Sequence, residues 1–513
     1  MVYSFDLPTT SHLSFQTALS SRTHPSLPQS ATTARHAFRL ALKAHNRLPR
    51  GPQRDSHLNA VLSALNDYLP YLVAIAQGLN RKPIDISAPT VNSQFEEIEV
   101  TQTAELRPEW RVTLASSSLS LKSKSARPTS NRTRGPEIPY ELAFTLTTLG
   151  YVLSSLARSG VTRTLYASST PSAEQRTAAT QTATKHLLQA SSIHRLLSSS
   201  SYFTVGLEGA IAPDLAPATQ AALSSLALAE ATLLAVLKDD SYVIACIQAR
   251  NPNDKDWMVR APEIPKVRAH LFARLCIRAA EYAEQAATGL GSVGVGGEGR
   301  RAGVDEDIVN YAGVLGLVAR ARACRFFGVD AELAGKIGEG IAWLRAAKGA
   351  LGLRAAGSTS TEEPAKSRGL SRLKQGLRDR REERRMEKGA GAADERLKKG
   401  ELGPGDNAGR EEERHVIDML EAKWVRMNDT INTQLVPSSA DHVANLPSGR
   451  DILPAQPPFK LPVLDEEHLS RMQAPPTELE LSLGSDIEDS DVESPVAGDA
   501  PGGFPERTDS AYY

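Results

Sequence analysis

The feature that most constrains this chain is a helical spacing of apolar residues, repeated along most of its length. In the segment 140–158 leucines stand three or four residues apart, and the segment 411–437 repeats this stripe with Val416, Leu420, Trp424, Met427 and Ile431. A helix with one apolar stripe must bury it against a neighbour. Consecutive helices of this kind predict TPR-like antiparallel pairs stacked into a curved, α-solenoid-like scaffold. The expected helices span 31–48, 55–79, 140–158, 173–197, 218–237, 265–287, 305–327, 331–353 and 411–437.

A short stretch in the N-terminal third follows a different period. Between residues 94 and 121, apolar side chains alternate with polar ones around Ile98 and Val100, and again around Trp110 and Val112. Alternation of this kind is typical of a strand with one buried face. We therefore expect an all-α fold with a small β-sheet beside the helices.

Charge and hydropathy exclude several classes of function. The 513 residues carry 59 Lys and Arg against 60 Asp and Glu, which leaves no excess of positive charge for bulk nucleic-acid binding. No apolar run reaches the length of a membrane span, and the N-terminus lacks a signal-peptide core. Cys246, Cys276 and Cys324 are widely spaced, as expected of buried thiols in a reducing compartment. A soluble, cytoplasmic protein is expected.

Two segments lack the composition of a packed core. Residues 357–409 combine Gly and Ser with dense charge, and residues 456–513 are acidic and rich in Pro, Gly and Ser. Low hydrophobicity with many charges is the signature of disorder. We expect one domain over 1–455 with a disordered charged insert at 357–409, followed by a disordered acidic tail. Within the tail, Ser485 and Ser490 stand in S-D-x-E settings that an acidophilic kinase could modify.

No set of residues has the spacing of a catalytic or metal site. The hexapeptide 289–294 matches the dinucleotide fingerprint formally, but a helical pattern precedes it where the fingerprint requires a strand. His186 and His194 can share one helix face, but their helix offers no third ligand at a suitable spacing. We therefore expect a protein that is not an enzyme and holds no cofactor or metal.

Four collinear stretches, 140–157, 184–197, 213–238 and 336–351, resemble helices of the Bro-type domain found in Alix-like proteins. The most diagnostic is 213–238: its Asp-Leu-Ala-Pro from Asp214 matches the family's Asp-Leu-Ser-Pro, and its Leu-Ala-Glu-Ala-Thr from Leu228 matches Leu-Ala-Gln-Ala-Gln. Glu230 and Thr232 thus replace both family glutamines. The MVYSF start and the block 422–451 are similar to the PalC branch of this family, fungal regulators of the response to ambient pH.

The resemblance implies a non-enzymatic adaptor of the fungal alkaline-pH signalling pathway. Such an adaptor binds ESCRT-III at cortical or endosomal sites and helps assemble a complex with a calpain-like protease, which leads to proteolytic activation of a zinc-finger transcription factor. The alternative is an endosomal cargo-sorting ESCRT adaptor of the Alix type. Because Alix-type proteins continue after the Bro-type domain with a long coiled domain and a Pro-rich tail, the acidic tail at 456–513 favours the first function.

The resemblance also indicates where the partner binds. In the family, the C-terminal amphipathic helix of the ESCRT-III core subunit rests on exposed apolar residues of two helices, a helix-in-groove mode of recognition. Matching by pattern gives Leu226 on the first helix, and Ile341 and Leu344 on the second. The alternative is that all three belong to the core.

Overall fold

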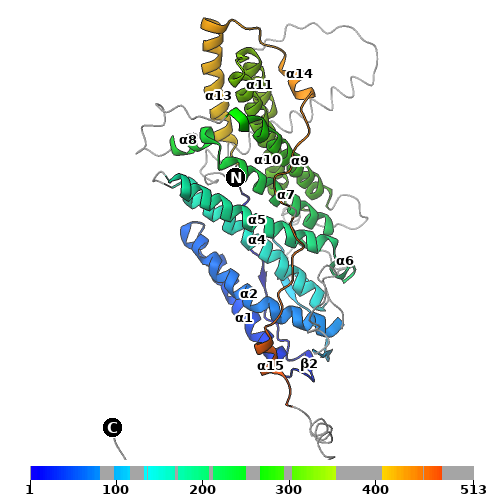
Figure 1. The fold of residues 1–513 in the computed structure, drawn as a ribbon. Coiled ribbons are helices and arrows are strands. Elements are labelled where there is room, and N and C mark those ends of the chain that lie inside the picture. Colours follow the sequence, from blue (N-terminus) through cyan, green and yellow to red (C-terminus); the bar gives the residue numbers. More distant parts are fainter. Residues whose placement is uncertain are drawn as a thin grey trace, which may run out of the picture.

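The computed structural model describes residues 2–80, 98–115, 132–135, 137–167, 171–206, 212–249, 266–293, 303–353, 407–454 and 456–475. Within these ranges the chain is mostly helical, and its long helices stack side by side into an elongated array (Figure 1). The prediction of an all-α fold with a small sheet in the N-terminal third is therefore confirmed. The long helices are α1 (Leu27–Arg47), α2 (Pro52–Asn80), α4 (Glu137–Leu165), α5 (Ala173–Ser199), α7 (Pro217–Leu237), α9 (Lys266–Ser292), α10 (Glu306–Leu333), α11 (Ile337–Ala350) and α13 (Arg410–Met427).

The long helices pack in chain order. Each contacts the next, from α1 and α2 through α4, α5, α7, α9 and α10 to α11, and α13 then returns against both α11 and α10. Sequential contacts of this kind are those of a stacked helical scaffold. Short helices fill the connections and the C-terminal part: α6 (Ser201–Gly206), the 3-10 turn η2 (Pro213–Leu215), α8 (Ser241–Ala249), α14 (Ser439–Ala444) and α15 (Glu466–Met472).

Two small antiparallel sheets lie beside the first helices. One has the strand order β1 (Thr9–Thr10), β4 (Glu109–Arg111), β5 (Arg132–Arg134), and the other pairs β2 (Leu19–Ser21) with β3 (Val100–Gln102). β3 and β4 lie in the stretch that the alternation indicated. β1, β2 and β5 were not predicted, because they lie outside the stretch 94–121 and their mostly polar residues show no alternation.

A buried carboxylate joins the first sheet to three helices. Glu141 of α4 accepts hydrogen bonds from Arg35 Nε of α1 at 2.8 Å, Tyr68 OH of α2 at 3.0 Å and Trp110 Nε1 of β4 at 2.6 Å. All four side chains are buried. A buried charge that is paired and fully hydrogen-bonded fixes its neighbours in one arrangement, so the sheet and the helices form one body.

Helix positions follow the sequence pattern, with two points of note. A proline inside a helix usually kinks or divides it, yet α2 runs without a break through Pro70, from Pro52 to Asn80. The expected helix 331–353 is shared between two elements, since α10 continues to Leu333 and α11 begins only at Ile337. Gly335, at a φ of 78°, makes the turn between them, a conformation that suits glycine.

The helix α13 buries most of its predicted stripe. Val416, Leu420 and Trp424 are buried, and the Trp424 ring packs where the backbones of Gly328 and Gly340 meet. The prediction that the stripe extends to Ile431 is wrong, because α13 gives way to the π-helical turn η4 (Asn428–Asn432). That turn carries Ile431 out of register with the core, and its side chain is 75% exposed.

The packed structure continues past the expected start of the tail at 456. Residues 456–475 include α15, in which Leu469 and Met472 are buried. Apolar residues within an acidic composition were enough to dock this short helix, which lies inside the segment expected to be a disordered tail. Most of the 357–409 insert, together with Ser485 and Ser490, lies outside the described residues, and the domain limits stay predictions.

Two helices are long and apolar enough to span a membrane by composition alone. In α7, 78% of the apolar window is buried inside the protein, and in α2 it is 50%. A helix that is apolar all round and buried is also the usual central helix of a packed array. The three cysteines predicted to be buried thiols are indeed buried, and none of them forms a disulfide.

We predict that Trp424→Ala lowers the free energy of unfolding by about 3–5 kcal/mol, because it leaves a cavity between α10, α11 and α13. Urea unfolding followed by circular dichroism measures the effect. Met419→Ala on the same helix is the control, since Met419 is 36% exposed and should cost less than about 1 kcal/mol. Equal small losses for both variants would contradict the packing described for α13.

Candidate partner-binding surface

The helix α7 occupies the middle of the array and is positioned by the residues that precede it. The Asp214 carboxylate accepts the backbone N–H groups of Thr113 at 3.1 Å and Leu114 at 3.2 Å, which ties η2 to the loop after β4. Pro217 then begins the helix, a position where its missing N–H costs nothing. The Asp-x-x-Pro motif therefore sets where α7 starts and how it is aimed.

The inner face of α7 carries a buried carboxylate. Glu230 Oε1 accepts the backbone N–H of Tyr3 at 2.8 Å and the hydroxyl of Tyr311 in α10 at 2.9 Å. Burial raises the pKa of Glu230 to about 7, although both hydrogen bonds favour the ionised form. Glu230 thus holds the N-terminal segment against α7 and α10.

Leu226, Ile341 and Leu344 lie inside the core. Their side chains are 1%, 1% and 0% exposed, which contradicts the exposed strip expected of them. Leu226 stands one turn before Glu230, so it shares the inner face of α7. Ile341 and Leu344 lie on α11, which is packed between α10 and α13. Binding of a partner at this surface stays a prediction and requires other residues.

The outward face of α7 consists mostly of small side chains. One flank of this helix meets α5, where Ser224 Oγ and Ser191 Oγ are 2.9 Å apart. The other flank meets α9, where Gly289 allows close approach to Ala222. We call the residues between these flanks the α7 stripe; they are exposed or half-buried, and they follow one another at steps of three, four, three and seven positions: Ala218, Ala221, Ser225, Leu228 and Ala235.

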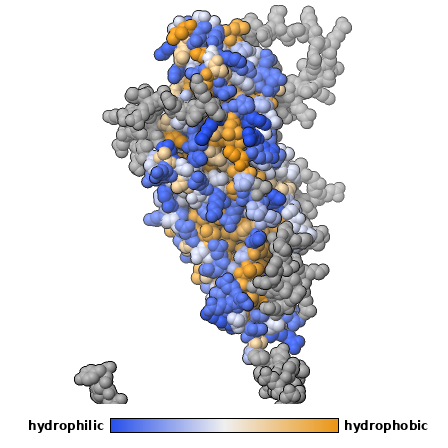
Figure 2. Space-filling view, viewed as in Figure 1, coloured by the Kyte–Doolittle hydropathy of each residue, from blue (hydrophilic) through white to orange (hydrophobic). Residues whose placement is uncertain are grey.

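The α7 stripe offers a shallow apolar seat for a helix. Small side chains allow another helix to approach closely, because interaxial distance depends on side-chain size. Apolar side chains also gather in a band down the middle of the face drawn in Figure 2. The sequence pattern did not reveal this stripe, because α7 is apolar nearly all round and its other faces also carry alanine and leucine.

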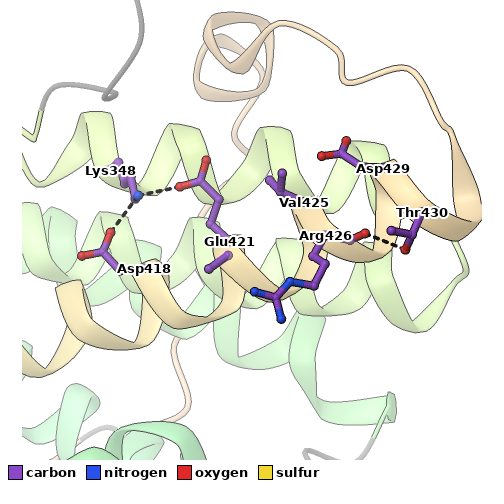
Figure 3. A pocket seen from close by; sticks show the side chains of 8 residues that line it. Lys348, Asp418, Glu421, Val425, Arg426, Asp429 and Thr430 are labelled. Atoms are coloured by element: carbon purple, nitrogen blue, oxygen red, sulfur yellow. Dashed lines mark hydrogen bonds and ion pairs between the residues drawn. The ribbon is translucent and has the colours of Figure 1, made fainter.

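Apart from the α7 stripe, a hollow of about 530 Å³ lies between α11 and α13 (Figure 3). Its charges are largely satisfied within the protein: Lys348 Nζ lies 2.7 Å from Asp418 Oδ1 and 2.5 Å from Glu421 Oε2. Val425 and Ala422 are its apolar lining residues. Because its main cation is already paired and its apolar lining is small, this hollow is a weaker partner seat than the α7 stripe.

A buried cluster of four charges holds α13 to the array. Glu413 of α13 lies 2.8 Å from Arg322 Nε and 2.5 Å from Arg325 Nε, both on α10. Arg325 Nη2 also lies 2.5 Å from Asp240, between α7 and α8. Burial opposes ionisation of Glu413, but the charges of Arg325 and Arg322 hold its pKa below the ordinary value. The cluster is a structural lock, since its groups are no more than 1% exposed.

No arrangement for catalysis or metal binding emerges from the described residues. In that part of the chain, no three His, Cys, Asp or Glu side chains are placed to share a metal ion. His194 Nδ1 is 2.7 Å from Gln220 Oε1, and burial lowers its pKa to about 4. His194 therefore serves packing between α5 and α7.

Comparison with known proteins gives a full-length relative. No family model matches the chain. The chain is 77% identical to the pH-response regulator protein palC of Emericella nidulans over 517 residues, which cover 100% of both chains. Among solved structures it is similar to the ALIX BRO1 CHMP4C complex, with 15% identity, a TM-score of 0.49, and coverage of 91% of this chain and 100% of that one. It is also similar to a structure described as the basis for endosomal targeting by the Bro1 domain, with 13% identity, a TM-score of 0.41, and coverage of 92% and 95%.

We predict that Glu230 makes stability fall as pH rises from about 4.5 to 7. Over this range the unfolded chain releases the proton while the folded protein, with a pKa of about 7, retains it. Wild type should therefore lose up to about 3 kcal/mol between pH 5 and pH 8 relative to Glu230→Gln. Urea unfolding across this pH range measures the difference.

The matched control is Glu174→Gln, which changes an exposed glutamate in the first turn of α5. This variant should keep the pH dependence of the wild type. A Glu230→Gln variant with the same pH dependence as wild type would show that Glu230 is ionised throughout, against the burial described here.

Proposed function

Because the chain belongs to the family of fungal PalC pH-response regulators, we propose that it is a non-enzymatic adaptor in signalling of ambient alkaline pH. The observation that carries this proposal is the 77% identity over the full length of both chains. The same identity favours this function over endosomal cargo sorting of the Alix type. The absence of a catalytic or metal-binding arrangement in the described residues is compatible with an adaptor.

The proposed partner is the C-terminal amphipathic helix of the ESCRT-III core subunit. Support comes from the likeness of 213–238 to the partner-binding helix of Bro-type domains, and we propose that the array is such a domain. The α7 stripe replaces Leu226, Ile341 and Leu344 as the proposed seat, because its residues face outward. An amphipathic helix gains free energy by laying its apolar side on such a surface, at about 25 cal/mol per Å² of apolar area buried.

Binding to ESCRT-III would bring the adaptor from the cytoplasm to cortical or endosomal sites. There it would help assemble the complex that contains a calpain-like protease, which activates a zinc-finger transcription factor by proteolysis. In this proposal the protein supplies surfaces and no reaction. Modification of Ser485 and Ser490 by an acidophilic kinase also stays a prediction.

We predict that Ala221→Asp weakens binding to the isolated C-terminal helix of the fungal ESCRT-III core subunit at least about tenfold, or 1.4 kcal/mol. The new carboxylate would lie in the middle of the apolar interface, where it loses water without a partner. Because Ala221 is exposed, the melting temperature should stay that of the wild type. Fluorescence anisotropy with a labelled helix measures the affinity.

The control is Ala44→Asp, the same change at an exposed position of α1, which should bind like wild type. In an Emericella nidulans strain lacking palC, wild type and Ala44→Asp should restore growth at alkaline pH, and Ala221→Asp should not. Failure of the wild type to restore growth would overturn the pathway. Unchanged affinity of Ala221→Asp would overturn the binding seat alone.

A further inference from the structure

The segment 446–465, which we call the strap, leaves α14 and is fixed to the outward face of α9. Arg450 N–H donates to the carbonyl of Arg274 at 3.1 Å, and Arg274 Nε donates to the carbonyl of Ser448 at 3.1 Å. Asp451 Oδ1 then accepts from Arg278 Nε at 2.9 Å and Tyr282 OH at 2.8 Å. These contacts form the near anchor of the strap.

Glycine is required within the near anchor. A Cβ on Gly449 would lie 2.7 Å from the Cα of Arg278, closer than side-chain atoms approach a backbone. The strap therefore lies directly on the α9 backbone at this point. Any larger residue at 449 would lift it.

The strap is fixed again at its far end, beside the N-terminal strands. Leu464 is buried, as are Leu469 and Met472 of the following α15. Beyond α15, the backbone N–H of Ala474 donates to the carbonyl of Thr23 at 2.7 Å, just after β2. The strap thus begins on α9 and ends at the opposite part of the array.

Chain length forces the strap to take a direct path. Asp451 and Glu466 are 15 residues apart in sequence, which spans about 50 Å when extended. Crossing from α9 over α7, α5 and α4 to the first helices covers about 32–40 Å, at 8–10 Å for each of four helix spacings. Little slack remains, so the strap must cross the outward side of α7, and Figure 1 shows its trace running over these helices toward α15.

The middle of the strap is held more weakly than its ends. Ile452 is 50% exposed and Val463 54%, while Leu453, Phe459 and Leu461 are half-buried against the core. Four prolines, at 454, 457, 458 and 462, keep this part extended and lack N–H donors. Among its described residues, no backbone N–H between Ile452 and Val463 donates to the helical array. Apolar contact is what keeps the middle in place.

We propose that the strap covers part of the α7 stripe in the unbound protein and that the partner helix binds by displacing the middle of the strap. This inference rests on the proposed function, because it concerns the same face of α7. Both the strap and the partner would use apolar contacts on that face, so they exclude one another. The near anchor is the point of release, since Arg278 and Asp451 are 28% and 53% exposed and their pair is open to solvent.

The test uses the full chain and the labelled C-terminal helix of the ESCRT-III core subunit. Asp451→Ala removes the acceptor of the near anchor, and Gly449→Val lifts the strap from α9. If the strap is displaced in about a tenth of wild-type molecules, either release should tighten binding by up to about tenfold. Asp441→Ala, at an exposed position of α14, is the matched control and should bind like wild type.

Hydrogen exchange gives a second readout on the wild-type protein. Adding the helix should speed exchange in the non-proline amides of 449–461 and leave α15 unchanged. Unchanged affinity in both release variants, or slower exchange in 449–461 on binding, would overturn the displacement and leave the proposed function standing. If neither wild type nor the release variants bind, the proposed function fails and this inference fails with it.

Discussion

One carboxylate, Glu413, closes the helical array, and much of the rest depends on its position. It accepts both Arg322 and Arg325 of α10 in the interior, and Arg325 reaches on to Asp240 between α7 and α8. Without α13, two guanidinium groups would lose their shared acceptor in an apolar interior. Removing one partner of a buried charge pair costs about 3–5 kcal/mol, so detachment of α13 from the array would carry a large free-energy penalty. Through Trp424, the same helix also packs against α11.

The docking of α13 determines where the C-terminal part of the chain can go. Gln434, just after η4, accepts the N–H of Gly338 at 3.0 Å through Oε1 and donates from Nε2 to the carbonyl of Gly335 at 2.9 Å. The chain is thereby fixed at the turn between α10 and α11 before it forms α14 and the strap. The ion-pair cluster at Glu413 therefore fixes where the following chain begins, and that chain continues through α14 into the strap. In this way the C-terminal segment of the protein comes to lie beside the proposed binding face of α7.

The sequence predicted the helices well, because a stripe that recurs every three or four residues is a direct consequence of helix geometry. It could not place the binding residues, for a physical reason visible in α7. This helix is apolar nearly all round, so periodicity alone cannot tell Leu226, which is buried, from Ala221, which is exposed. The hollow between α11 and α13 was equally hidden, because it depends on the packing of segments about 70 residues apart. For Glu230, the sequence did show that a glutamate replaces the family's glutamine. Only the structure shows that this glutamate is buried and that burial raises its pKa.

The central claim is that α13 is an integral part of the array, held by Glu413, and is not an appendage after the charged insert. Native-state hydrogen exchange tests this most directly, because it reports the free energy of opening for each helix. The account predicts that amides near Val416 and Leu420 exchange with the same free energy as those near Cys324 and Phe326 of α10, since all require global unfolding. An opening free energy for α13 lower than that of α10 by more than about 2 kcal/mol would mean that the helix detaches alone, and would contradict the account.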